Sequence, residues 1–179
     1  MVLAKYTDMS LKDVLKEKKS RIVKKWFEAV LETYHENARG PLGKREAQFT
    51  NPVGYNLSQG IEGLFDATLE GLIPDDVSRF LDDMIRIRAV QAFTPSQAVA
   101  FIFEAKRIVR KELANELLHD PRMREELEAW DSAVDDLVLF SFDIYMQCRE
   151  KIYDLKANEA RNLTFRLLQK AKLITEDQE

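Results

Sequence analysis

Two Glu-x-x-His pairs, Glu32 with His35 and Glu116 with His119, have the residue types and spacing that best suit metal chemistry. Residues three apart share one face of a helix, and di-iron sites in helical bundles combine two such pairs with two further glutamates. The helical wheel opposes this interpretation. At about 100° per residue, Glu32 points nearly opposite the apolar face of its helix, and His119 lies to one side of its own. We therefore keep Glu116, His119 and His35 as weak metal candidates, favour surface or C-terminal capping roles, and expect no cofactor.

The sequence offers little for haem, redox or nucleophilic chemistry. An all-α chain with two histidines would permit haem, but neither histidine falls in the middle of a helix on a strongly apolar face. Cys148 lies on the expected inner stripe of the last helix, where a small buried hydrophobe is the favoured role. The serines have no histidine and carboxylate at a recognisable spacing, and the glycines form no phosphate-binding loop. We predict that the protein is not an enzyme.

Arg88 is the most informative charged residue of the sequence. It continues the apolar stripe of a helix expected at about 75–92, whereas Arg86 points outward. The rest of the stripe consists of Val77, Phe80, Leu81, Met84 and Ile85. A guanidinium on a core-facing stripe needs a carboxylate, backbone carbonyls or an anionic ligand. We expect an internal partner such as Glu104 or Asp143, and keep an anion or a carboxylate of a partner protein as the functional alternative.

The glycines and prolines divide the chain into helices. All six glycines lie within 40–71, and three prolines beyond them each stand where a helix is expected to begin, because proline fits the first helical turn. These prolines are Pro74, Pro95 and Pro121. Thr94 is a good N-cap, and Gln97 completes its capping box. No segment shows sustained strand alternation. We predict an all-α single bundle of about five helices, at 10–37, 54–70, 75–92, 95–119 and 121–172.

The last of these helices is long for a globular protein, and its apolar stripe thins beyond residue 155 to Leu163, Leu167 and a few neighbours. We predict a helical domain at 1–153 and a C-terminal helical extension at 154–179. The extension could pair with a second copy, so a homodimer is expected.

Composition and charge exclude several classes of protein. The chain has 179 residues, which suggests one domain, and a net charge of −4, which argues against a dedicated nucleic-acid binder. No apolar run approaches the roughly 20 residues that span a bilayer, and the opening residues lack the apolar stretch of a secretory signal. We expect a cytoplasmic protein without membrane insertion.

Charge is distributed unevenly along the chain. Residues 12–25 hold seven Lys or Arg, and residues 112–136 hold nine Asp or Glu. We interpret both segments as solvated helix faces. The alternatives are a docking face, or contact between the two segments within a dimer.

Two segments, Phe-Thr-Asn-Pro-Val-Gly-Tyr at 49–55 and Arg-Ile-Arg-Ala-Val-Gln-Ala-Phe-Thr-Pro-Ser-Gln-Ala-Val-Ala-Phe at 86–101, resemble the RsbRD N-terminal domain family, as does Trp26 with Tyr34. The likeness runs from about Leu11 to Cys148. It implies a helical, globin-like input module without haem, which serves bacterial stress signalling as a dimer and carries no catalytic residues. The chain continues too briefly for a STAS or kinase output domain, so we expect it to act through a separate protein partner.

The motif residues surround two joints of the chain. Asn51 and Pro52 favour an extended turn and Gly54 a tight entry into the next helix, whereas Thr94 and Pro95 set a sharp joint between the third and fourth helices. A second set of residues forms our candidate ligand or partner site beside that joint: Arg88, Gln91, Arg86 and Gln97. A molecule bound there would shift the fourth helix.

We therefore predict a sensor or protein-interaction domain. The alternative is a small-molecule or metal-binding helical protein with a redox role. A third class is an accessory subunit of a larger complex.

Overall fold

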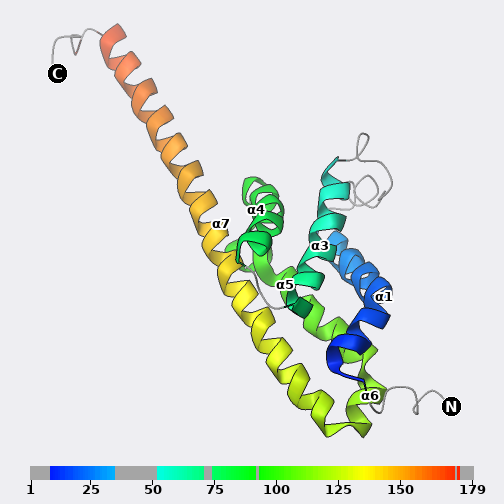
Figure 1. The fold of residues 1–179 in the computed structure, drawn as a ribbon. Helices are drawn as coiled ribbons and strands as arrows, with labels where there is room; N and C mark the ends of the chain where they lie inside the picture. Colours follow the sequence, from blue (N-terminus) through cyan, green and yellow to red (C-terminus); the bar gives the residue numbers. More distant parts are fainter. Residues whose placement is uncertain (1–8, 35–51, 71–73, 92, 172, 174–179) are drawn as a thin grey trace. The chain divides into compact units, whose positions relative to one another are not determined.

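A computed structural model of the chain describes residues 9–34, 52–70, 74–91, 93–171 and 173. Within these residues the chain forms six helices and no strand (Figure 1), which confirms the predicted all-α bundle. The helices are α1 (Leu11–Glu32), α3 (Pro52–Glu70), α4 (Pro74–Val90), α5 (Pro95–Glu112), α6 (Ala114–His119) and α7 (Pro121–Lys170). The expected helix starts at Pro74, Pro95 and Pro121 are confirmed.

The prediction of one continuous fourth helix at 95–119 was wrong, because this segment divides at Leu113 into α5 and α6. Leu113 is fully buried with φ −105° and ψ 11°, outside the usual helical values. The preceding carbonyl, that of Glu112, accepts a hydrogen bond from the Lys18 ammonium at 2.6 Å. A side chain of α1 therefore interacts with the backbone at the point where the helix breaks.

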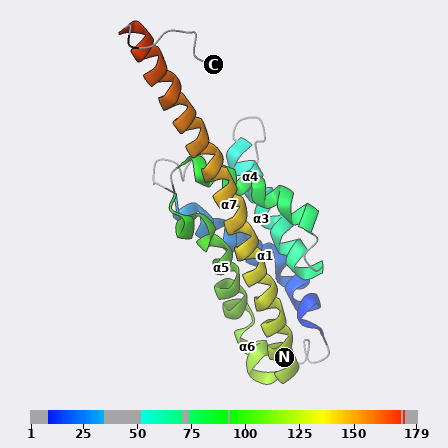
Figure 2. The same cartoon turned by 90° about the vertical axis from the view of Figure 1, so that its left-hand side faces the viewer.

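The apolar faces of the first helices pack around a shared core. α1 packs against α3 and α5, and α3 packs against α4, as both views show (Figures 1 and 2). Trp26 and Phe27 of α1 and Phe101 of α5 are almost completely buried. The indole Nε1 of Trp26 donates to the Phe101 carbonyl at 2.7 Å, so this large side chain is buried with its polar atom satisfied. Burial of this apolar surface is the main stabilising term of the fold.

The chain divides into two compact units, Met1–Tyr145 and Met146–Glu179. The domain boundary that we expected between residues 153 and 154 stays a prediction. In the second unit the described side chains are exposed or half-exposed along the helix. Among the described residues no helix is both long and apolar enough to cross a membrane.

Candidate functional site

The guanidinium of Arg88 lies fully buried where the ends of three helices meet. Arg88 belongs to the last turn of α4 and is 0% exposed. Its Nη1 donates to the Gln97 carbonyl in the first turn of α5 at 3.1 Å, and its Nη2 donates to Oγ1 of Thr33, the C-cap residue of α1, at 3.0 Å. One side chain thus links α1, α4 and α5. We call this cluster the Arg88 junction.

Three aromatic rings surround the Arg88 guanidinium. Its Cζ lies 4.6 Å from the ring centroid of Phe101, 5.0 Å from that of Phe93 and 5.1 Å from that of Tyr34. The Tyr34 and Phe93 rings meet edge to face at 5.5 Å. These distances are in the range of cation–π attraction, which replaces part of the hydration that the cation loses on burial.

The positive charge of the junction has no counter-charge among the described residues. No described carboxylate lies within ion-pair distance of Arg88, and its buried Nε has no hydrogen-bond partner there. Burial lowers the pKa of Arg88, an effect that Tyr34 opposes. Burial also raises the pKa of Tyr34, and the guanidinium opposes that shift. Both shifts follow from placing polar groups in a poorly hydrated core.

The expected internal carboxylates lie elsewhere, so that prediction was wrong. Glu104 pairs with Arg107 at 2.7 Å on the surface of α5, and Asp143 is exposed on α7. A backbone carbonyl and a threonine hydroxyl take the place of a carboxylate at Arg88. These neutral acceptors satisfy hydrogen-bond geometry but leave the charge uncompensated.

Phe93 connects the junction to α7. Its backbone N–H donates to the Arg88 carbonyl at 3.3 Å, and its own carbonyl accepts a hydrogen bond from the hydroxyl of Tyr145. Tyr145 is buried on α7. A movement of the α4–α5 connection therefore alters a contact made by the last helix of the first unit.

The four predicted site residues do not all meet. Gln97 lies at the junction through its carbonyl, and its side-chain Oε1 accepts from the Thr94 N–H at 3.1 Å. Arg86 is exposed, and its Nε donates to Asp82 at 2.5 Å. Gln91 is exposed. The structure therefore brings Arg88 and Gln97 together and leaves Arg86 and Gln91 on the surface.

The motif residues at the two joints are partly described. Thr94 is the N-cap of α5, Pro95 follows it, and the capping box with Gln97 is complete, so this predicted joint is confirmed. Pro52 opens α3 and Gly54 is buried in its first turn. Asn51 lies outside the described residues.

The weak metal candidates have other contacts or lie outside the description. Glu116 accepts a hydrogen bond from Lys18 Nζ at 2.5 Å, and His119 Nδ1 lies 2.7 Å from the Asn115 carbonyl. His35 is not among the described residues, and Cys148 is half-buried. Over the part of the chain that the structure describes, no three His, Cys, Asp or Glu side chains are placed to hold one metal ion.

Much of the basic segment at 12–25 pairs with acidic residues of the same chain. Glu112, whose side chain is 7% exposed, binds Arg21 at 2.5 Å and Lys25 at 2.6 Å. The interpretation of both charged segments as solvated faces is therefore wrong for Glu112, whereas Arg21 and Lys25 keep about half of their side-chain surface exposed. The basic and acidic segments meet within one chain.

Thr33, Phe93 and Phe101 are the residues of the junction that sequence reasoning missed. The two phenylalanines lay in the segment quoted for the family resemblance, and no role was assigned to them. Thr33 carried no signal, because the first helix was predicted to continue to residue 37, whereas it ends at Glu32. Only the fold shows that they enclose a cation.

Neither a curated protein nor a solved structure matches the chain, so the globin-like topology stays a prediction. A family described as the RsbT co-antagonist protein rsbRD N-terminal domain matches residues 20–160. The matched range includes the whole Arg88 junction and most of the chain. The resemblance carried by the motif residues is thereby confirmed, and the chain belongs to the RsbRD N-terminal domain family.

Proposed function

We propose that this chain is a non-catalytic, cytoplasmic input module of bacterial stress signalling, which receives a signal and acts through a separate protein. Membership of a family of stress-signalling input domains supports the role. The single observation that carries the mechanism is the buried charge of Arg88, which no described carboxylate neutralises.

The helix ends that meet at such a junction can adopt two arrangements of similar free energy. A buried cation without a counter-charge is costly, and an anion or a partner carboxylate that reached it would bind favourably. A ligand shifts a conformational equilibrium only by its difference in affinity for the two states. Arg88 supplies this difference in affinity, because the contacts that Arg88 makes also fix the ends of α1, α4 and α5. The Phe93–Tyr145 hydrogen bond extends the change to α7.

A deletion and complementation experiment tests this function. Source cells that lack the gene are expected to lose the normal stress response, measured as stress-induced transcription before and after an environmental challenge. The wild-type chain restores it, whereas Arg88→Met is expected to restore the protein level but to leave transcription insensitive to the challenge. Arg86→Met, on the exposed side of the same helix, serves as the matched control and should behave as wild type.

Two results would count against the proposal. An unchanged stress response in the deletion strain would remove the signalling role. Full restoration by Arg88→Met would keep that role and remove Arg88 from its mechanism.

We further propose that the module acts as a homodimer through the second unit. Four side chains recur at seven-residue intervals along its helix: Met146, Tyr153, Ala160 and Leu167. Tyr153 and Leu167 are each 57% exposed. Most helical stability in proteins comes from packing an apolar face, and apolar residues at seven-residue intervals are one part of the pattern by which two helices pack together. A second copy would cover this stripe.

A pair of substitutions tests the dimer. Tyr153→Glu places a charge on the stripe and is expected to shift sedimentation from dimer to monomer. Leu155→Glu is the control, because Leu155 is 70% exposed and lies two residues on, about 200° around the helix. We expect it to leave the dimer intact. Equal dissociation by both variants, or a monomeric wild type, would reject the stripe as the interface.

A further inference from the structure

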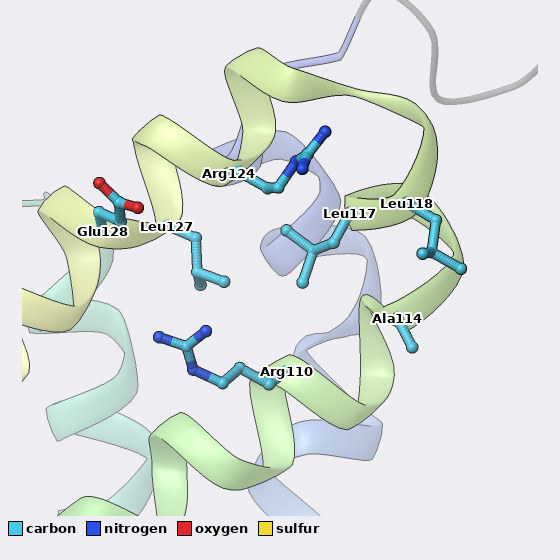
Figure 3. Close-up of a pocket in the computed structure, with 7 residues that line it drawn as sticks. All are labelled: Arg110, Ala114, Leu117, Leu118, Arg124, Leu127 and Glu128. Carbon is cyan, nitrogen blue, oxygen red and sulfur yellow. The ribbon is translucent and has the colours of Figure 1, made fainter.

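A hollow of about 410 Å³ opens between the end of α5, the short helix α6 and the first turns of α7 (Figure 3). Leu127, almost completely buried, and the half-buried Leu117 form its apolar floor. Leu118 stands at its edge and is 74% exposed. A volume of this size accommodates one or two large side chains.

Helix α6 is fastened to the bundle by its polar side. Lys18 Nζ donates to Glu116 Oε1 at 2.5 Å and to the Glu112 carbonyl at 2.6 Å, and both side chains of the ion pair are about nine-tenths buried, at 10% and 9% exposure. Apart from Glu116 and the half-buried Leu117, the residues of α6 are exposed. The ion pair therefore holds the helix in place while Leu118 stays exposed and Leu117 is only half-buried. An exposed apolar face beside a charged rim is typical of a protein-interaction site.

The rim of the hollow carries hydrogen-bond donors for a negatively charged partner. In the view of Figure 3 the guanidinium groups of Arg110 and Arg124 lie on either side of Leu127. Arg110 forms an ion pair with Asp131, which balances its charge but leaves further N–H donors of its planar group. Arg124 is exposed and has no ion pair with any residue that the structure describes. Glu128 also stands at the rim and disfavours a carboxylate on its own side.

We propose that this hollow docks an acidic amphipathic segment of a separate protein. A large apolar side chain of that segment covers Leu117 and Leu127, and its carboxylate pairs with Arg124. The site is too open for a small ligand to lose most of its contact with water, whereas a protein segment also covers Leu118 and the rim. The inference rests on the proposed function in one respect, because it names the surface through which the module meets its partner.

Site-specific photo-crosslinking in the full-length chain tests the docking site. Leu118 is replaced by p-benzoylphenylalanine, the protein is irradiated in an extract of the source cells, and the crosslinked segment is sequenced by mass spectrometry. We expect one protein segment that combines acidic and large apolar residues. Arg124→Glu is expected to lower the crosslink yield by about tenfold, because like charges would then face each other. Glu128→Gln should raise the yield, and Arg79→Glu, an exposed arginine of α4, should leave it unchanged.

A parallel crosslinker at Leu139, which is 66% exposed on α7 outside the hollow, distinguishes failure of the docking site from failure of the proposed function. Crosslinks to another protein from Leu139 alone would overturn the docking site and leave the proposed function in place. No crosslink to another protein from either position would count against both. A basic segment, a second copy of this chain, or a yield insensitive to Arg124→Glu would overturn the site.

Discussion

Arg88→Met is expected to leave the melting temperature of the first unit unchanged or to raise it, whereas Arg88→Ala is expected to lower the free energy of unfolding by about 3 kcal/mol. Methionine has nearly the length and volume of the buried arginine stem and needs no hydration. Replacing a buried charge by an apolar group of similar volume is often neutral or stabilising. Alanine leaves a cavity that the surrounding rings fill only in part.

The contacts that Arg88 makes explain why we expect Arg88→Met to keep the stability of the fold. Arg88 donates hydrogen bonds to two neutral acceptors, the Gln97 carbonyl and the Thr33 hydroxyl. The Thr33 hydroxyl also donates to the Val30 carbonyl at 2.7 Å, so it keeps a partner without Arg88. The lost cation–π attraction, about 0.5–2 kcal/mol, is offset by the removal of an uncompensated buried charge.

Denaturant unfolding followed by circular dichroism measures both variants, with Arg86→Met as the surface control. A methionine variant as unstable as the alanine variant would mean that the fold itself requires the charge. In that case the Arg88 junction would serve the stability of the fold, and a signal could not use the buried charge to change the conformation. A methionine variant that is stable but has lost signalling would show that Arg88 serves signalling and is not needed for the stability of the fold.

The position of Arg88 in the core was predictable from the sequence, but its partners were not. Its place on an apolar helical stripe requires that it turn inward, since a helix repeats every 3.6 residues. Thr33 contributes to the junction from 55 residues away in sequence. Periodicity shows which face of a helix is buried, and it contains no information on which other helix end meets that face.

The break at Leu113 shows the same limit for the fold. Helix starts were readable because proline and N-cap residues act locally. Leu113, in contrast, fits the apolar periodicity of one continuous helix from Pro95 onward. The hydrogen bond at the break comes from Lys18, 94 residues away from Glu112. A local pattern cannot report an interaction that depends on tertiary structure.

Lys18→Met is expected to lower the free energy of unfolding by about 3–5 kcal/mol, a large effect for a lysine in a strongly basic segment. The ammonium of Lys18 is one member of an ion pair with Glu116 that is about nine-tenths buried, and it also bonds to the Glu112 carbonyl. Removing it leaves a carboxylate buried without a cation. Lys24→Met is the control, because Lys24 is 66% exposed and lies 4.0 Å from Glu28. We expect that change to stay within about 0.5 kcal/mol.

A double-mutant cycle in denaturant decides what the basic segment does. The double variant Lys18→Met/Glu116→Leu is expected to be more stable than Lys18→Met alone, because it removes the uncompensated carboxylate together with its partner. If Lys18→Met lowers the free energy of unfolding no more than Lys24→Met does, the ion pair of Lys18 with Glu116 is solvated. The basic segment is then available to an outside partner. If the expected coupling is found, Lys18 holds α6 against α1. The attachment of α6, and with it the hollow beside Leu117, then depends on a charge pair within the chain, and the place to look for the partner is the apolar side of α6.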